Sequence, residues 1–127
     1  MEFDYTTSTN KTFNEAVEVT QAEIAKAGFR VLYIHDVQKT LSEKGFQREP
    51  LKIIEFCNAK DAHEFLNRDI KISLCLPCKI NVYQKDGQTF ISGMRPIVLP
   101  KFFPKADLEK RVEEIDKIIR NIINNAK

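Results

Sequence analysis

The chain has 127 residues, 43% of them hydrophobic and 30% charged, and its formal net charge is +2. This length and composition are those of one folded globular domain whose apolar core needs no disulfide or metal crosslink. The near balance of 20 basic and 18 acidic residues argues against nucleic-acid binding through a basic surface, because neutralising phosphates needs a clustered excess of Lys and Arg.

The first residues, Met1-Glu2-Phe3-Asp4, are acidic and do not resemble a secretory signal peptide. No apolar run approaches the roughly 18–20 residues that span a bilayer. We therefore expect a cytoplasmic protein without a membrane partner. The three cysteines are too few and odd in number for a disulfide framework, so we expect free thiols at positions Cys57, Cys75 and Cys78.

The first half of the chain alternates between strand and helix patterns. Thr12-Phe13-Asn14-Glu15 is a capping box, in which the hydroxyl and the carboxylate each satisfy an unpaired amide at a helix start. Asp36 and Asn58 are placed to cap two further helices. The elements predicted for this half are an edge strand over residues 2–8, a helix from Phe13 to Gly28, a strand from Phe29 to His35, a short helix to about Lys44, a strand from Leu51 to Cys57, and a third helix after Asn58.

Apolar and polar residues then alternate strictly from Ile70 to Tyr83. A period of two predicts a half-buried strand with one core face and one polar face. At about 3.3 Å per residue this strand would exceed roughly 40 Å, which is long for a small domain. Pro77 cannot donate to a strand ladder, so we expect a bulge or an edge position near it.

The chain then returns through a hairpin at Asp86-Gly87 into a strand from Thr89 to Met94. A segment with three prolines follows, from Arg95 to Pro104. The spacing of the apolar residues predicts a last helix from Asp107 to about Asn124. The order of elements predicts an α+β fold in which helices pack on a mostly antiparallel sheet.

Three segments resemble a known family, the domain of unknown function 302 (DUF302) family. Gly28-Phe29-Arg30-Val31-Leu32, with Asp36-Val37 after it, looks like the family's "GFxVL…DV" opening. Ile53-Ile54-Glu55-Phe56-Cys57-Asn58, followed by Ala62-His63, looks like its "IL-x-x-CNP…AH" segment. Leu76-Pro77-Cys78, followed by Val82, is similar to its "LLPC…V" strand.

This resemblance runs from about Phe13 to Pro96, so we expect a single domain over residues 1–127 with a family-like core at about 13–96 and a C-terminal extension and helix at 97–127. It implies a two-layer α+β sandwich of the TATA-binding-protein-like shape with helices on one face, and a homodimer. It implies no activity and no cofactor. Two residues depart from the family pattern: Ala59 stands where the family has proline, and Cys75 is an additional cysteine.

Cys75-Leu76-Pro77-Cys78 has the CxxC spacing of redox and metal motifs. A thioredoxin-like pair lies at a helix N-terminus, whereas this one lies in a strand pattern. In a regular strand the residues at i and i+3 point to opposite faces, which places Cys75 outward with Ser73 and Cys78 inward with Ile72. A structural zinc site would need about four ligands, and a second CxxC or His pair is absent from the sequence, so no metal is predicted.

Cys57 and Cys78 are the better candidate pair. Cys57 ends a strand just before Asn58 caps a helix, so its sulfur could lie near the electropositive end of that helix. If the two strands are neighbours, both thiols line one pocket. The alternative is that both are small buried hydrophobic residues, the commonest fate of a free cysteine.

His63 lies on the third predicted helix, on a face that could look back toward Cys57. A Cys–His nucleophile pair is conceivable there, because an imidazole would take the thiol proton. The sequence identifies no third group that would orient the imidazole. A histidine on a helix surface is more often simply solvated, so the catalytic residues stay unassigned.

The segment from Arg95 to Pro104 carries five large apolar residues. They could pack in the core or at an interface, or they could form an extended lid over a ligand. We favour core or interface packing, because large apolar patches rarely stay exposed. Two functions remain open. One is a small-ligand-binding or thiol redox-responsive domain with a site at Cys57, Asn58, His63 and Cys78. The other is a non-catalytic structural or interaction protein that forms a homodimer through its apolar C-terminal region. A hydrolytic enzyme ranks third, because no catalytic constellation is recognisable.

Overall fold

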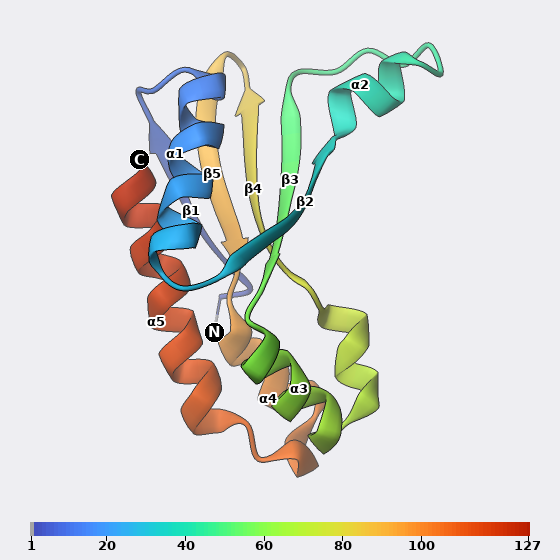
Figure 1. Cartoon of the computed structure of the whole chain (residues 1–127). Coiled ribbons are helices and arrows are strands. Elements are labelled where there is room, and N and C mark those ends of the chain that lie inside the picture. The colour runs from blue at the N-terminus through green and yellow to red at the C-terminus, as the bar shows by residue number, and fades with distance from the viewer. Residues whose placement is uncertain (1) are drawn as a thin grey trace.

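The computed structural model describes residues 2–127, which form one five-stranded sheet and the helices around it (Figure 1). Every neighbouring pair of strands is antiparallel, in the spatial order β1-β5-β4-β3-β2. The strands that the sequence predicts near the N-terminus and before Asn58 are both present. The strands are β1 (Asp4–Thr9), β2 (Arg30–Asp36), β3 (Leu51–Cys57), β4 (Cys78–Lys85) and β5 (Gln88–Met94).

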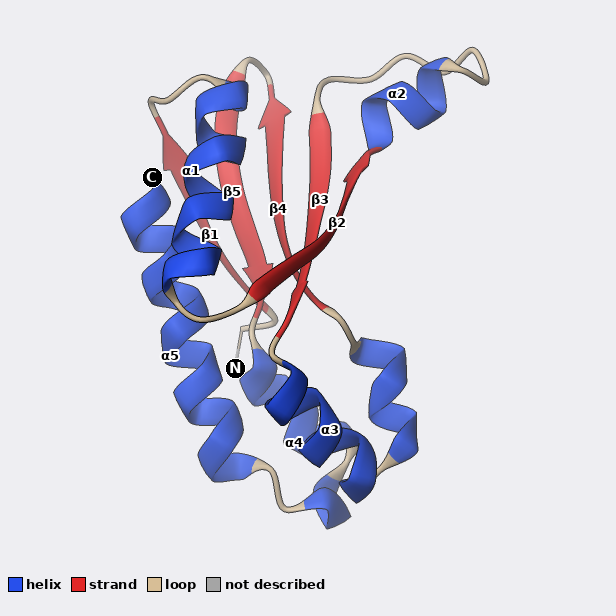
Figure 2. Ribbon diagram, viewed as in Figure 1, coloured by secondary structure: helices blue, strands red, loops and turns tan. Residues whose placement is uncertain are grey.

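The helices differ widely in length, and the two longest lie at opposite ends of the chain (Figure 2). Among the described residues, no helix is both long enough and apolar enough to cross a membrane. The α-helices are α1 (Phe13–Lys26), α2 (Val37–Ser42), α3 (Ala59–Arg68), α4 (Leu99–Phe102) and α5 (Glu109–Ala126), and the 3-10 helices are η1 (Ile70–Cys75), η2 (Pro96–Val98) and η3 (Pro104–Ala106).

Local capping groups define where the helices begin, as the sequence predicts. The Thr12 hydroxyl accepts from the Glu15 amide at 3.2 Å, and the Thr12 amide donates to Glu15 Oε1 at 3.3 Å. Asp36 accepts from the Lys39 amide and starts α2 in the same way. These bonds satisfy amides that a helix itself leaves unpaired, so each start is specified by a few consecutive residues.

One face of the sheet is covered by α1 and α5, and the core lies between them and the strands. Ile54, Ile80, Val82 and Ile91 alternate along the three central strands and are fully buried on that face. Within residues 2–127, neither long helix lies on the opposite face (Figure 2). The prediction of an α+β fold with a mostly antiparallel sheet and helices on one face is therefore confirmed, and the likeness to the TATA-binding-protein shape stays a prediction.

The C-terminal helix belongs to the core and does not form a separate extension. Its apolar stripe is buried, and Ile119 and Ile123 lie against Gly93 of β5. A Cβ atom at Gly93 would come within 3.1 Å of Ile123 Cδ1, so the absence of a side chain there is what lets α5 approach the sheet. The apolar stripe of α5 is therefore part of the core of the domain itself, and the homodimer stays a prediction.

The long strand predicted from Ile70 to Tyr83 is wrong in its first half. The 3-10 helix η1 occupies Ile70–Cys75, and β4 begins only at Cys78. The interruption lies at Pro77, where the sequence predicts a break. In η1 the polar and apolar residues still alternate in sequence, but the backbone repeats every three residues instead of every two.

That change of period reverses the expected direction of two side chains. Residues three apart share a face in a 3-10 helix, so Cys75 lies on the same side as Ile72, which is fully buried. Leu74, which the strand pattern places in the core, is instead 84% exposed. The prediction that Cys75 points outward and away from Cys78 is therefore wrong.

Candidate functional site

The cysteines gather at one end of the sheet, where β4 begins and β3 ends (Figure 2). Helical segments surround this end of the sheet. They are α3, η1, α4 and the first half of α5. Strands β3 and β4 are neighbours, and Phe56 is the pairing partner of Cys78. The three cysteines thus reach one region from three different elements, because η1, β3 and β4 all end or begin there.

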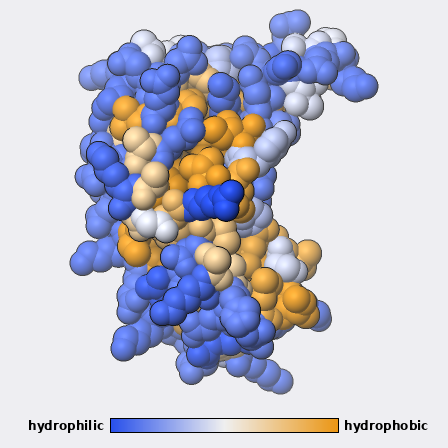
Figure 3. All heavy atoms as spheres, viewed as in Figure 1, coloured by the Kyte–Doolittle hydropathy of each residue, from blue (hydrophilic) through white to orange (hydrophobic). Residues whose placement is uncertain are grey.

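The larger opening in this region, which we call the cysteine cavity, has a volume of about 190 Å³. All of its lining residues are apolar except Cys75, Cys78 and Lys79. Leu74 lies at its exposed side, where Figure 3 shows hydrophobic surface over η1. Its walls come from α3, η1, β4, β5, η2, the start of α4 and α5, and include Phe65, Leu76, Met94, Leu99, Ile115 and Ile119.

A second, much smaller void of about 20 Å³ lies beside the cysteine cavity and shares Phe65, Leu76, Cys78 and Ile115 with it. Cys57, Asn58 and Asp61 line only this small void. The structure therefore brings Cys57 and Cys78 to one place, but the space that they share holds about one water molecule at most. The space large enough for a ligand is bordered by Cys78 and Cys75.

Burial keeps the thiols of this site protonated. Desolvation raises the pKa of Cys78 from its ordinary value of 9.0 to about 11, and the neighbouring Cys57 and Asp61 raise it further while Lys79 lowers it. The pKa of Cys57 is also raised, first by burial and then by the Asp61 carboxylate. This direction is opposite to the one expected from the start of α3, because desolvation and then the Asp61 carboxylate both favour the neutral thiol.

The Asp61 carboxylate is held in place by an arginine from the other side of the site. Asn58 caps α3 by accepting from the Asp61 amide at 3.2 Å, which sets the start of the helix. Arg111 of α5 then donates to both oxygens of Asp61, at 2.8 and 2.7 Å. This pair raises the pKa of Arg111, and it fixes α3 against α5.

His63 is not part of the site. Its side chain is exposed on α3, and its Nε2 atom lies 3.4 Å from the Asn67 amide nitrogen one turn further along the helix. It lines neither the cysteine cavity nor the small void. The arrangement thus provides no imidazole that could take the proton of Cys57, and we do not propose a Cys–His pair.

The CxxC spacing does not form a thioredoxin-like site. Cys75 ends a 3-10 helix and Cys78 begins a strand, so neither sulfur lies at the start of an α-helix. All three cysteines are free thiols. Among residues 2–127, no three or more His, Cys, Asp and Glu side chains gather in a way that could hold a metal ion.

Several residues of the site carry no signal in the sequence. The sequence predicts only ordinary core positions for the apolar lining residues that are distant from Cys78 in the chain. These are Met94, Leu99, Ile115 and Ile119. Asp61 and Arg111 are charged residues on separate amphipathic helices, where such residues are normally solvated. Their pairing depends on how α3 and α5 pack, and no local motif reports that.

The comparisons with known proteins agree on one family. The family described as "Domain of unknown function DUF302" matches residues 5–126, which includes residues 97–126 beyond the predicted family-like core. A crystal structure of the uncharacterized conserved protein DUF302 from Bacillus stearothermophilus is similar at 30% sequence identity, with a TM-score of 0.92 over 100% of both chains. No curated protein matches the chain. The chain therefore belongs to the DUF302 family.

Proposed function

We propose that this domain binds a small, uncharged and largely apolar molecule in the cysteine cavity. The single observation that carries the proposal is a cavity of about 190 Å³ whose walls are apolar apart from the thiols of Cys75 and Cys78 and Lys79. A concave apolar site with a few polar groups is typical of small-molecule binding. An empty apolar space of this kind also leaves its walls without contacts that a ligand would restore.

The volume limits the size of the ligand. An apolar cavity of about 150 Å³ in another protein accepts benzene, so the cysteine cavity is suited to one ring or a short branched chain. Lys79 at the rim and the thiols of Cys75 and Cys78 are the polar groups that a ligand could meet. We therefore expect one weak hydrogen bond at most, with the rest of the affinity coming from apolar contact.

The state of the thiols favours binding over redox chemistry. The thiolate is the reactive form of cysteine, and a pKa of about 11 leaves Cys78 almost wholly protonated near neutral pH. The raised pKa of Cys57 acts in the same direction. A redox-responsive role at Cys57 and Cys78 would need the opposite shift, so we favour ligand binding for this site.

Nuclear magnetic resonance of the full chain with indole and toluene tests the proposal. We expect amide shifts in residues 74–79 and 94–99, and slower alkylation of Cys75 when a probe is bound. The substitution Cys75→Phe should fill the cavity and abolish the amide shifts. Ser73→Phe, on the exposed side of η1, is the matched control and should leave them unchanged. Absence of shifts at probe saturation, or equal shifts in Cys75→Phe, would falsify the proposal.

A second candidate function is association of two copies through the uncovered face of the sheet. Tyr83 and Phe90 lie side by side on that face, with their ring centroids 5.4 Å apart, and Tyr33 on the same face is 59% exposed. Half-buried aromatic side chains on the same open sheet face as an exposed tyrosine are typical of an interaction surface. We infer a homodimer in which this face, and not α5, is the contact.

Analytical ultracentrifugation separates this candidate from ligand binding. We expect a dimer for the natural chain and a monomer for Tyr83→Lys, because a charge would be buried at the contact. Phe102→Lys removes an aromatic residue that is 72% exposed on α4, and it should leave the dimer intact. A natural chain that sediments as a monomer at every concentration rules the dimer out. Neither outcome alters the ligand test.

A further inference from the structure

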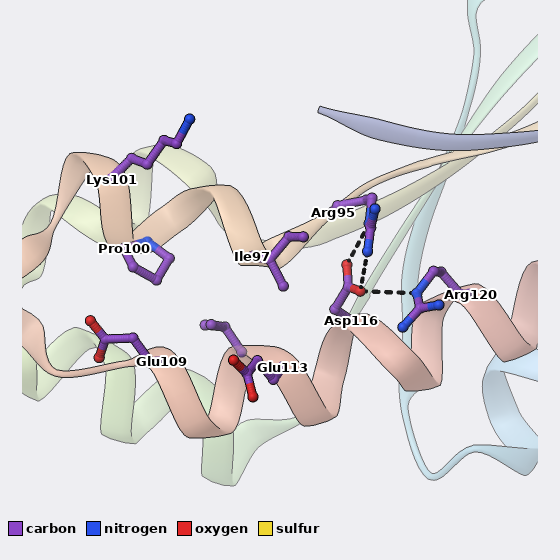
Figure 4. Close-up of a pocket in the computed structure, with 9 residues that line it drawn as sticks. Arg95, Ile97, Pro100, Lys101, Glu109, Glu113, Asp116 and Arg120 are labelled. Carbon is purple, nitrogen blue, oxygen red and sulfur yellow. Dashed lines mark hydrogen bonds and ion pairs between the residues drawn. The ribbon is translucent and has the colours of Figure 1, made fainter. Parts of the chain in front are cut away.

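We propose that a second cavity, between the η2–α4 segment and α5, binds a small linear zwitterion that carries one carboxylate and one ammonium group. This cavity, which we call the arginine cavity, has a volume of about 560 Å³, within the usual range for ligand sites (Figure 4). Arg95, Asp116 and Arg120 lie at one end of it, and Glu109 and Lys101 lie toward the other. The proposal goes beyond the ligand site at the cysteines.

The two cavities lie on opposite sides of the same segments. Pro96 and Leu99 line the cysteine cavity, whereas Ile97 and Pro100 line the arginine cavity. The residues of α5 are divided between the two cavities in the same way. Ile115 lines the cysteine cavity, and residues 112, 113 and 116 line the arginine cavity. The arginine cavity is therefore a separate site with its own chemistry, and it does not contain any of the cysteines.

A buried carboxylate fixes two arginines at one end of this cavity. Asp116 is 2% exposed and accepts from Nε and Nη2 of Arg95, at 3.1 and 2.9 Å, and from Nε of Arg120 at 3.0 Å. Two guanidinium groups share one carboxylate, so this end keeps a net charge of +1. The bonds to Asp116 hold both groups in one orientation before any ligand arrives, which lowers the cost of binding.

The arginines also keep unused donors. Within residues 2–127, neither terminal nitrogen of Arg120 has a protein acceptor, and its side chain is 40% exposed. These two nitrogens can donate together to one carboxylate, the geometry for which a guanidinium is best suited. Asp116 accepts three hydrogen bonds, and the one from Arg120 comes from Nε alone.

Carboxylates of α5 provide the complementary charge. Glu113 and Glu109 lie about one and two turns before Asp116 on the same side of the helix, and neither forms an ion pair with a described residue (Figure 4). Glu113 lies nearer to the arginines than Glu109 does, and the exposed Lys101 on α4 points away from Glu109. The charges of the lining residues cancel overall, so the site favours a ligand with no net charge but with two charged ends.

The spacing along α5 sets the length of the ligand. Glu113 and Arg120 are seven residues apart, which is about 10 Å along a helix axis. This rise along the helix axis exceeds the charge separation of an α-amino acid. The apolar residues Ile97, Pro100 and Val112 would contact the chain between the two charged groups. The ligand class is therefore an extended zwitterion, such as an ω-amino acid or a short peptide with free ends.

Isothermal titration calorimetry of the full chain tests this inference. The probes are aminohexanoate for an ω-amino acid and triglycine for a peptide, with glycine, hexanoate and hexylammonium as comparisons. We expect aminohexanoate or triglycine to bind. Glycine, hexanoate and hexylammonium should bind at least about tenfold more weakly, because one charge-assisted hydrogen bond contributes about that factor to the affinity. Tighter binding of aminohexanoate would indicate an ω-amino acid as the ligand, and tighter binding of triglycine would indicate a short peptide.

Charge variants locate the binding. Arg120→Gln and Glu113→Gln should each weaken it by about tenfold or more. Lys117→Gln and Glu18→Gln remove the same charges from exposed positions outside the cavity, and should leave the affinity unchanged. Glu113 is exposed, so its variant tests the site even if the change at Arg120 impairs folding. No heat from any probe, equal binding of hexanoate and aminohexanoate, or equal effects of the control variants would each overturn the inference.

Discussion

Arg111 of α5 holds the carboxylate of Asp61 in α3 by two hydrogen bonds, from Nε at 2.8 Å and from Nη2 at 2.7 Å. The same arginine donates to Glu114 at 2.7 Å, so one guanidinium serves two carboxylates. Asp61 in turn borders the void that Cys57 and Cys78 share. This one contact therefore connects the packing of two helices with the electrostatics of the thiols.

Removing the arginine should destabilise the domain. In Arg111→Gln the carboxylate of Asp61, whose side chain is only 11% exposed, loses its charged partner. We expect a loss of about 1–2 kcal/mol, less than for a fully buried pair because Arg111 itself is partly solvated. Urea unfolding measures it. Lys26→Gln, which breaks the exposed Lys26–Glu23 pair, is the control and should change the free energy of unfolding by less than about 0.5 kcal/mol.

The same pair should set the reactivity of Cys57. The Asp61 carboxylate raises the pKa of Cys57, so Asp61→Asn should lower it and speed alkylation by iodoacetamide at a given pH. Arg111→Gln leaves the carboxylate without its counter-charge and should slow the same reaction. The pH profile of the alkylation rate of Cys57 checks both changes. Shifts of the same sign in the two variants would contradict the electrostatic explanation.

Stability should fall at alkaline pH because of Cys78. Its pKa is about 11 in the folded chain against an ordinary value of 9.0, so the unfolded chain releases this proton first as the pH rises. The stabilisation from the protonated Cys78 is complete below pH 9 and is lost between pH 9 and 11, by roughly 3 kcal/mol at most. Cys78→Ala should remove this part of the pH dependence. Cys75→Ala should retain it.

A methyl group at Gly93 should disturb the contact between β5 and α5. It would meet Ile123 at 3.1 Å and Ile119 at 3.3 Å, closer than ordinary contact. We expect Gly93→Ala to lower the free energy of unfolding by about 1–3 kcal/mol, the usual cost of overpacking. Thermal unfolding measures it. The double variant with Ile123→Val should recover part of the loss if the steric explanation is right, and Ile123→Val alone gives the reference.

Much of the local structure could be predicted from the sequence. Thr12 with Glu15, and Asn58, begin their helices where predicted, because each cap bonds to amides two or three residues away. Asp86 and Gly87 both have positive φ and turn the chain between β4 and β5 as the Asp-Gly pair predicts. The position of Cys57 at the end of β3 also follows from these short-range patterns, whereas its place near Cys78 depends on the pairing of β3 with β4.

The tertiary structure alone decided the form of the site. The alternation from Ile70 to Cys75 suits a strand or a 3-10 helix, and packing of η1 onto the core selected the helix, which turned Cys75 inward. Arg111 meets Asp61, and Arg95 meets Asp116, only because α5 returns across the sheet and the segments next to it. A sequence specifies caps and periods through neighbouring residues, whereas the volume of a cavity and the partner of a buried charge depend on segments that are distant in the chain.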